Sequence, residues 1–159
     1  MFNPKKTIEM KLNKTVFMLL AALMTFVAAS ASDRIYHDGS MLPAPAKALL
    51  EKNFKAKVSI VKVDKDFGRV SDYEVVLTDG TEVTFDRSGN WTEIETSIDK
   101  SVPSVFVPKA MSEFVKKNHK DTKIVGLEKK GSRGGYEAVF SNGIEARFDS
   151  QGNFLRYDD

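Results

Sequence analysis

Apolar and polar residues alternate in two similar stretches of the chain, residues 72–91 (DYEVVLTDGTEVTFDRSGNW) and residues 135–154 (GYEAVFSNGIEARFDSQGNF). An alternation with a period of two is typical of strands that bury one of their faces. An Asp-Gly pair at 79–80 and an Asn-Gly pair at 142–143 interrupt the alternation. These pairs favour tight hairpins, because a type I′ turn needs positive φ at both central residues. The duplication predicts a repeated unit of structure.

Further strands are predicted on both sides of these hairpins. Residues 58–64 (VSIVKVD) are rich in β-branched side chains, and residues 124–128 (IVGLE) are their shorter counterpart. Longer turns at 86–90 and 149–153 each carry a glycine placed for a left-handed conformation. The predicted strands are therefore 58–64, 72–78, 81–85 and one that begins at Trp91, followed by 124–128, 136–141, 144–148 and one that begins at Phe154.

A helical period precedes each set of strands. Pro43 and Pro108 open these segments, and proline is tolerated in the first turn of a helix, where its missing N–H has no partner. The Lys-Asn pairs at 52–53 and 117–118 suit helix C-termini, since a cation there opposes the helix dipole. The predicted apolar stripes consist of Ala44, Ala48, Leu49 and Phe54 in the first helix, and Ala110, Met111, Phe114 and Val115 in the second.

Runs of strands with one helix in each half predict an α+β fold, in which the helices cover one face of an antiparallel sheet. Trp91 and Phe154 are assigned to the covered core, because an aromatic repeated at one position usually packs the repeat. Alternation assigns to the same core Tyr73, Val75, Leu77, Val83, Phe85, Tyr136, Ala138, Phe140, Ala146 and Phe148. The opposite face is left to water or to a partner. Its candidate binding residues are Glu74, Val76, Glu82, Thr84, Glu137, Val139, Glu145 and Arg147.

The two helix openings, at 42–43 (LP) and 107–108 (VP), and the duplicated YEV…DG.E..FD..GN pattern resemble the PepSY-like family of exported, β-lactamase-inhibitor-like proteins. The resemblance covers 42–159 and implies a tandem repeat whose two four-stranded sheets join into one eight-stranded curved sheet. It also implies a sheet face that clasps a target enzyme. The inhibitor for which the family is named carries disulfides and aromatic contact residues, whereas this chain has no cysteine and a face of mostly Glu, Thr and Val. The resemblance therefore supports the fold and not β-lactamase inhibition.

Residues 1–31 have the pattern of a secretory signal peptide, with four lysines, an apolar run at 16–29 and small residues before the cleavage position. The apolar run is shorter than the roughly 20 residues of a membrane-spanning helix. We therefore predict export to the periplasm or the extracellular space from a start at Met1 or Met10, without a membrane anchor. The predicted organisation is a flexible leader at 32–41, a first repeat at 42–98, a linker at 99–106 and a second repeat at 107–159, with 42–159 forming one globular domain.

The sequence offers little for catalysis. It has no cysteine, no serine in a G-x-S-x-G context, and two histidines, His37 and His119, which are both expected to be solvated. Residues 64–68 (DKDFG) fail as a Ca²⁺ loop, because no Glu stands at the twelfth position, and they predict a hairpin turn instead. Asp86 and Asp149 are expected to bond to the backbone of their own turns. We expect no enzyme activity, no metal and no cofactor.

Charge distinguishes the remaining classes of function. Cleavage of the signal peptide leaves 20 Lys+Arg (24 less four) against 21 Asp+Glu (22 less one), a net charge near −1, and no basic face for nucleic acid. Glu74, Glu82, Glu137 and Glu145 recur on the uncovered face, either as an ordinary solvated surface or as an acidic surface that recognises basic groups. We expect a binding module for a protein or peptide partner, with inhibition of a hydrolase as one form of that function. The alternative is a structural protein of the cell envelope, and the oligomeric state is left open.

Overall fold

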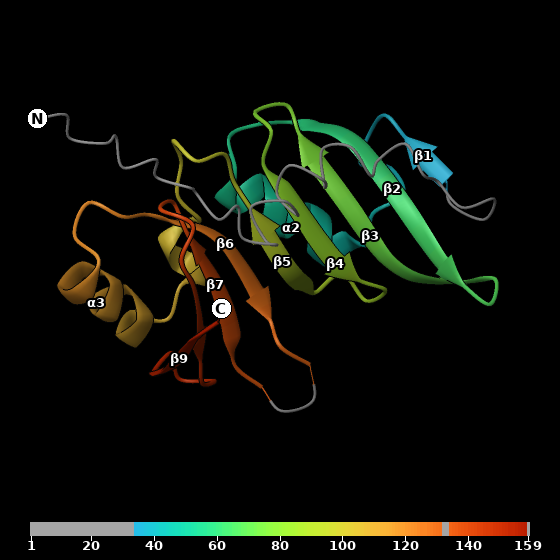
Figure 1. The fold of residues 1–159 in the computed structure, drawn as a ribbon. Coiled ribbons are helices and arrows are strands. Elements are labelled where there is room, and N and C mark those ends of the chain that lie inside the picture. The colour runs from blue at the N-terminus through green and yellow to red at the C-terminus, as the bar shows by residue number, and fades with distance from the viewer. Residues whose placement is uncertain (1–33, 132–133, 159) are drawn as a thin grey trace, which may run out of the picture.

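The computed structural model describes residues 34–131 and 134–158, which form one curved antiparallel sheet of nine strands with two α-helices (Figure 1). The strands lie in the sheet in the same order as in the chain, so each one pairs with its neighbours in sequence. The strands are β1 (Arg34–Tyr36), β2 (Val58–Asp66), β3 (Arg69–Leu77), β4 (Glu82–Asp86), β5 (Trp91–Glu95), β6 (Ile124–Lys129), β7 (Tyr136–Phe140), β8 (Glu145–Phe148) and β9 (Phe154–Asp158).

One helix precedes the strands of each half. Helix α2 (Ala44–Asn53) comes before β2 to β5, and helix α3 (Lys109–Asn118) comes before β6 to β9. A short 3₁₀ helix, η1 (Ser104–Phe106), lies in the connection between the halves. The halves join where β5 pairs with β6, so the sheet is continuous across the seam. The predicted α+β class and the single antiparallel sheet are confirmed.

The same residue types begin and end both helices. Pro43 is the N-cap residue of α2, and Pro108 is the N-cap residue of α3. The last residue of each helix is an asparagine, whose side-chain amide donates to the carbonyl four positions earlier, at 2.8 Å for Asn53 and 2.9 Å for Asn118. This bond holds the asparagine side chain against the last turn of its own helix. The helix openings and endings predicted from the sequence are therefore confirmed.

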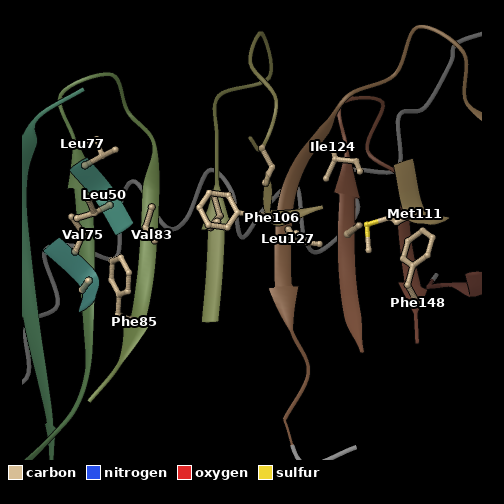
Figure 2. Close-up of a cluster of buried hydrophobic side chains, with 14 of the residues drawn as sticks. Leu50, Val75, Leu77, Val83, Phe85, Phe106, Met111, Ile124, Leu127 and Phe148 are labelled. Carbon is tan, nitrogen blue, oxygen red and sulfur yellow. The ribbon is translucent and has the colours of Figure 1, made fainter. Parts of the chain in front are cut away.

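Both helices pack on one face of the sheet and share one hydrophobic core (Figure 2). Leu50 of α2 and Met111 of α3 belong to the same buried cluster as Phe85 and Phe148 from the strands. Burying one such phenylalanine completely stabilises the fold by about 1.5–3 kcal/mol. The residues that alternation assigned to the core lie in this cluster or pack against it.

A glycine in each of the longer turns lies against the start of a helix. Gly89 has φ 86° and Gly152 has φ 85°, which favours glycine at both positions. A Cβ atom at Gly89 would lie 2.9 Å from the Cβ of Pro43, and one at Gly152 would lie 2.4 Å from the Cβ of Pro108. The proline at each helix opening therefore requires a glycine in the turn that packs against it. This contact explains why the two motifs occur together in both halves.

The predicted count of eight strands is wrong, because the predicted flexible leader at 32–41 contains strand β1. This short strand pairs antiparallel with β2, and Tyr36 lies opposite Val61. Tyr36 also packs against the hydrophobic core, and this contact stabilises the pairing of β1 with β2. A three-residue strand in a polar segment carries too few alternating positions to be recognised from the pattern.

The predicted signal peptide at 1–31 lies outside the described residues. Within the described part of the chain, no helix is long and apolar enough to cross a membrane. The proposed boundaries between leader, repeats and linker stay predictions.

Candidate functional site: the open face of the sheet

The face of the sheet that the helices leave uncovered is called the open face here. Directly opposite residues on neighbouring strands have Cβ atoms about 4.5–5.5 Å apart, so the strand register gives the order of side chains across this face. One row runs through Ile60, Val76, Glu82, Glu95, Gly126, Val139, Glu145 and Asp158. The second row runs through Lys62, Glu74, Thr84, Glu93, Glu128, Glu137, Arg147 and Arg156. All eight candidate binding residues lie in these rows, and their role in binding stays a prediction.

Three glutamates converge in the middle of the open face. Glu82 of β4 lies opposite Glu95 of β5, and Glu93 lies on the same side of β5 in the neighbouring row. All three side chains are partly buried. Within the described part of the chain, none of them forms an ion pair with a lysine, arginine or histidine. Glu82, Glu93 and Glu95 are called the central carboxylate cluster below.

The central carboxylate cluster favours protonation. Burial, reinforced by the charges of Glu93 and Glu82, raises the pKa of Glu95 from its ordinary value of 4.5 to about 7. Protonated Glu95 donates a hydrogen bond to Glu93, whose own pKa is raised by burial and by the charge of Glu128. Burial also raises the pKa of Glu82. The cluster therefore gains or loses a proton near neutral pH and has unused capacity to accept a cation.

The carboxylates near β9 are neutralised instead. Lys130 Nζ lies 3.0 Å from a carboxylate oxygen of Glu137, and Arg147 Nη2 lies 3.2 Å from the same side chain. Arg147 also contacts Asp158 through Nε. Each carboxylate of this group has a cationic partner within the protein. The group is called the terminal ion-pair network and consists of Lys130, Glu128, Glu137, Arg147, Asp158 and Arg156.

A third acidic group lies on β2 and β3. One carboxylate oxygen from each of Asp64, Asp72 and Glu74 lies within 4.8 Å of the others, a spacing that could hold a metal ion. Lys62 Nζ lies 2.9 Å from Asp64 and 3.3 Å from Glu74, so an ammonium of the protein already neutralises part of the group. Burial opposes the charge of Lys62, but the hydrogen bond to Asp64 and the charge of Glu74 outweigh it and raise the pKa of Lys62.

The three acidic turns predicted from the sequence are present. The predicted hairpin turn at 64–68 is shorter than expected, because β2 continues to Asp66. Phe67 and Gly68 alone connect β2 to β3, and both have positive φ. Asp86 Oδ1 accepts the N–H of Asn90 at 2.9 Å, and the corresponding bond from Asn153 to Asp149 is 2.8 Å long. These aspartates therefore fasten their own turns.

Sequence reasoning missed two members of the central carboxylate cluster, Glu93 and Glu95. Trp91 lies opposite Phe85 on the covered face, and strict alternation from Trp91 would place both glutamates on that face as well. The register shifts between Thr84 and Phe85, and this β-bulge turns the rest of β5 over. Charge could have revealed the bulge, because glutamates are almost never fully buried without a partner.

The expectation that both histidines are solvated holds for His37 and is wrong for His119. His37 is exposed, whereas His119 is partly buried. The Nε2 atom of His119 lies 3.0 Å from the hydroxyl of Tyr157, and its ring centroid lies 5.0 Å from that of Phe140. Strand β9 brings Tyr157 to the end of α3, which the local sequence around His119 does not reveal. The histidine packs the end of the helix onto the sheet.

The structure confirms that Trp91 and Phe154 pack against the core. The ring of Phe154 stacks on Phe114 of α3 with a centroid distance of 4.4 Å. The ring of Trp91 meets Phe106 edge-on at 5.4 Å, and Lys129 Nζ lies 3.8 Å from its centroid. Both aromatics therefore join a helix or connection to the sheet rather than presenting a free ring on the open face.

A small α+β protein with a helix-covered sheet and a polar open face is the class that this architecture defines. A family model described as "Putative beta-lactamase-inhibitor-like, PepSY-like" matches residues 71–156, which is more than half of the chain. The protein belongs to this PepSY-like family. The family is in general non-catalytic. No curated protein matches the chain.

Solved structures of related chains have the same fold. A protein from Bacteroides vulgatus described as "a putative periplasmic protein of unknown function" is 39% identical, with a TM-score of 0.72, over 80% of this chain and 99% of that one. A "putative calcium-regulated periplasmic protein" from Bacteroides thetaiotaomicron is 30% identical, also with a TM-score of 0.72, over 82% of this chain and 100% of that one. A second Bacteroides vulgatus protein, also described as periplasmic, is 30% identical with a TM-score of 0.70, over 82% of this chain and 100% of that one.

Proposed function

We propose that this protein is an exported, non-enzymatic binding module whose open face takes up an extended, cationic segment of a protein partner. The observation that carries the proposal is the central carboxylate cluster, in which three partly buried glutamates lie together and none forms an ion pair with a cation of the described part of the chain. Gathering like charges in a partly buried site costs free energy. A bound cation removes that cost. The periplasmic relatives support export.

The neighbours of the cluster favour lysine or arginine side chains over a bare ion. Val76 and Val139 lie in the same row as Glu82 and Glu95, one on each side of them. Lysine and arginine combine an apolar stem with a charged head, so the stem contacts the valines while the head reaches the carboxylates. An extended segment laid across the strands presents such side chains at regular intervals.

The electrostatic gain is of the right size. At the effective dielectric constant of a protein surface, an ammonium about 4 Å from a carboxylate is attracted by about 4 kcal/mol. Each unit of pKa corresponds to about 1.4 kcal/mol. Because the pKa of Glu95 is raised from 4.5 to about 7, the free energy that favours its protonated form is comparable to this attraction. Binding therefore displaces the proton, and the affinity is expected to rise between pH 6 and pH 8.

A direct test uses a ten-residue peptide of alternating lysine and serine, titrated into the purified protein by calorimetry. We expect saturable binding that weakens as salt is raised, since salt screens surface charge. Glu93→Arg places a cation inside the cluster and is expected to weaken binding by at least about tenfold, which corresponds to about 1.4 kcal/mol. Unchanged binding by this variant removes the cluster from the proposed function.

Two controls separate recognition from general acidity. Glu113→Arg makes the same change of two charge units on the exposed surface of α3, away from the open face, and is expected to leave binding unchanged. A peptide in which glutamate replaces lysine should not bind. Equal loss of binding in Glu113→Arg and Glu93→Arg would mean that only the net charge of the protein matters.

A calcium-dependent role is the second candidate. One relative is described as calcium-regulated, and in this chain Asp64, Asp72 and Glu74 bring their carboxylate oxygens within 4.8 Å of one another. Oxygen ligands of this kind suit Ca²⁺. Lys62 competes for the same carboxylates, which makes weak binding the expectation for this chain.

Removing the competing ammonium tests the calcium role. Lys62→Met keeps the length of the side chain and eliminates its charge, so it should bind Ca²⁺ at least about tenfold more tightly than the natural chain if the three carboxylates form the site. Calorimetric titration with CaCl₂ measures both proteins, and Asp72→Asn in the Lys62→Met background should abolish the gain. The calcium role is dropped if Lys62→Met binds no more tightly than the natural chain.

A further inference from the structure

A pocket of about 460 Å³ lies on the helix side of the sheet, away from the open face. It is open to solvent and is lined by the loop before α2, by α2 itself, by the connection after α2 and by the start of β2. Pockets of roughly 300–1,000 Å³ are the usual size for small organic ligands. Its apolar lining consists of Leu42, Leu50, Phe54, Ala56 and Val58.

The polar residues of this pocket are mainly cationic. Lys47, Lys55 and Lys57 line it, opposed by the single acidic side chain of Glu51. None of the three lysines forms an ion pair with another described residue, and Lys47 Nζ donates to the carbonyl of Ser40 at 2.9 Å. The C-terminus of α2 adds only about half a negative charge. The pocket therefore keeps a net positive charge above an apolar floor.

The pocket depends on a small residue in the loop before α2. A Cβ atom at Gly39 would lie 3.6 Å from both Leu42 Cδ1 and Val58 Cγ2. In the second half, Ile124 has the register position of Val58, and the buried residue Val102 donates its N–H to the carbonyl of Ile124 at 2.8 Å. In the second half, the larger residue Val102 therefore lies against strand β6, whereas in the first half Gly39 lies beside Val58 of β2.

We propose that this pocket binds a single-chain fatty acid, with the alkyl chain on the apolar floor and the carboxylate at Lys47, Lys55 and Lys57. The two parts of the site match the two parts of such a ligand in polarity and in sign of charge. Burying each methylene group of the chain contributes about 0.8 kcal/mol, which makes the apolar floor the main source of affinity. The lysines select an anionic head group.

The single tryptophan of the chain reports on occupancy. Phe54, which lines the pocket, stacks on Phe106 at 5.8 Å, and Phe106 meets the ring of Trp91 at 5.4 Å. A ligand that touches Phe54 is therefore expected to change the emission of Trp91. The probe is dodecanoate, kept below its micelle concentration and titrated into the purified protein at two salt concentrations, with calorimetry as the second readout.

Two variants test the two parts of the site. Gly39→Leu fills the pocket and should abolish dodecanoate binding; Gly39 has no positive φ and its added Cβ would meet only ordinary contacts, so the fold should tolerate the change. The double variant Lys55→Glu and Lys57→Glu leaves the interior untouched and should weaken binding by about tenfold or more, since each exposed ion pair contributes about 0.2–1 kcal/mol and reversal adds repulsion. The double variant Lys116→Glu and Lys117→Glu makes the same charge change on α3 and should bind like the natural chain.

The natural chain is expected to bind dodecanoate at least about tenfold more tightly than dodecanol, which has the same alkyl chain and no charge. Equal affinity for the two ligands overturns the proposal, as does full affinity in Gly39→Leu or in the Lys55/Lys57 variant. Absence of any binding at millimolar dodecanoate overturns it as well. If Gly39→Leu does not fold, the Lys55/Lys57 variant and the dodecanol comparison still decide the outcome.

Discussion

The central carboxylate cluster lies on β4 and β5, and part of the terminal ion-pair network lies in the equivalent place on β8 and β9, where cations of the chain pair with the carboxylates. Both follow the same bulged pairing between the last two strands of a half. In the second half two arginines stand where the first half has threonine and glutamate. The equivalent register pairs are Glu82–Glu95 and Glu145–Asp158 in one row, and Thr84–Glu93 and Arg147–Arg156 in the other.

This comparison separates what the fold requires from what it permits. The second half shows that the same strand geometry accommodates cations beside its carboxylates, so the backbone does not force the first half to leave its glutamates unpaired. Natural proteins often retain locally unfavourable groups where function needs them, at a cost in stability. The unpaired cluster is thus the part of the open face where a functional interpretation has a physical basis, while the network near β9 is explained by stability alone.

The largest expected effect on stability comes from removing the cation that neutralises the acidic group on β2 and β3. Lys62→Met removes the ammonium that lies beside Asp64 and Glu74, and the side chain of Lys62 is only 13% exposed. Removing one partner costs up to about 1 kcal/mol at exposed ion pairs and about 3–5 kcal/mol at buried ones. We expect a loss of about 2 kcal/mol in the free energy of unfolding at pH 8, measured by urea denaturation.

The charge-matched control for this variant is Lys116→Met on the exposed surface of α3, which is expected to change stability by less than about 0.5 kcal/mol. The loss in Lys62→Met should shrink at pH 4, because burial raises the pKa of Asp72 and of Glu74, so these two carboxylates lose their charge more readily as the pH falls. A variant as stable as the natural chain at pH 8 would mean that Lys62 does not neutralise the acidic group, and the distinction between paired and unpaired regions would weaken.

Much of the fold could be predicted because turns and helix ends carry strong local signals. The positive φ of Gly89 and its close approach to Pro43 leave few alternatives to the observed residues, and Asp86 fastens the same turn. Period-two alternation then identifies the buried positions between the turns. These constraints act over a few residues, so one sequence is enough to read them.

The candidate site was only partly predictable because it depends on register and on distant pairings. The extra residue of the bulge in β5, Thr92, moves Glu93 and Glu95 to the open face, and alternation alone does not show this. Likewise, the contact between His119 and Tyr157 joins residues that only the order of strands brings together. Whether a glutamate has a cationic neighbour is a property of paired strands, and the local pattern does not contain it.

The second prediction concerns how much the central carboxylate cluster destabilises the folded protein, measured as a function of pH. The pKa of Glu95 is about 7 in the folded protein against an ordinary value of 4.5, so folding takes up a proton between these values. Stability from this group is therefore complete below about pH 4.5 and is lost as the pH rises to about 7. Glu95→Gln should raise the free energy of unfolding by about 1–2 kcal/mol at pH 8 and by little at pH 4, measured by urea denaturation.

The same variant should weaken binding of the lysine–serine peptide, so stability and affinity are expected to move in opposite directions. This pairing distinguishes a functional cluster from an ordinary wet surface, for which peptide binding would not change. A Glu95→Gln protein that is no more stable at pH 8 than the natural chain would show that the carboxylates do not repel one another appreciably in the folded state.

The smallest expected effect belongs to Glu145, the second-half equivalent of Glu82. It lies opposite Asp158 in register, whose charge Arg147 and Arg156 already neutralise. Glu145→Gln should therefore change the free energy of unfolding by less than about 0.5 kcal/mol at pH 4 and at pH 8. Glu82→Gln, made in parallel, should stabilise the protein at pH 8, because burial raises the pKa of Glu82 in the folded state. If both variants gain stability at pH 8 to the same extent, glutamates destabilise the folded protein equally across the open face. The central carboxylate cluster would then not differ from the rest of that face.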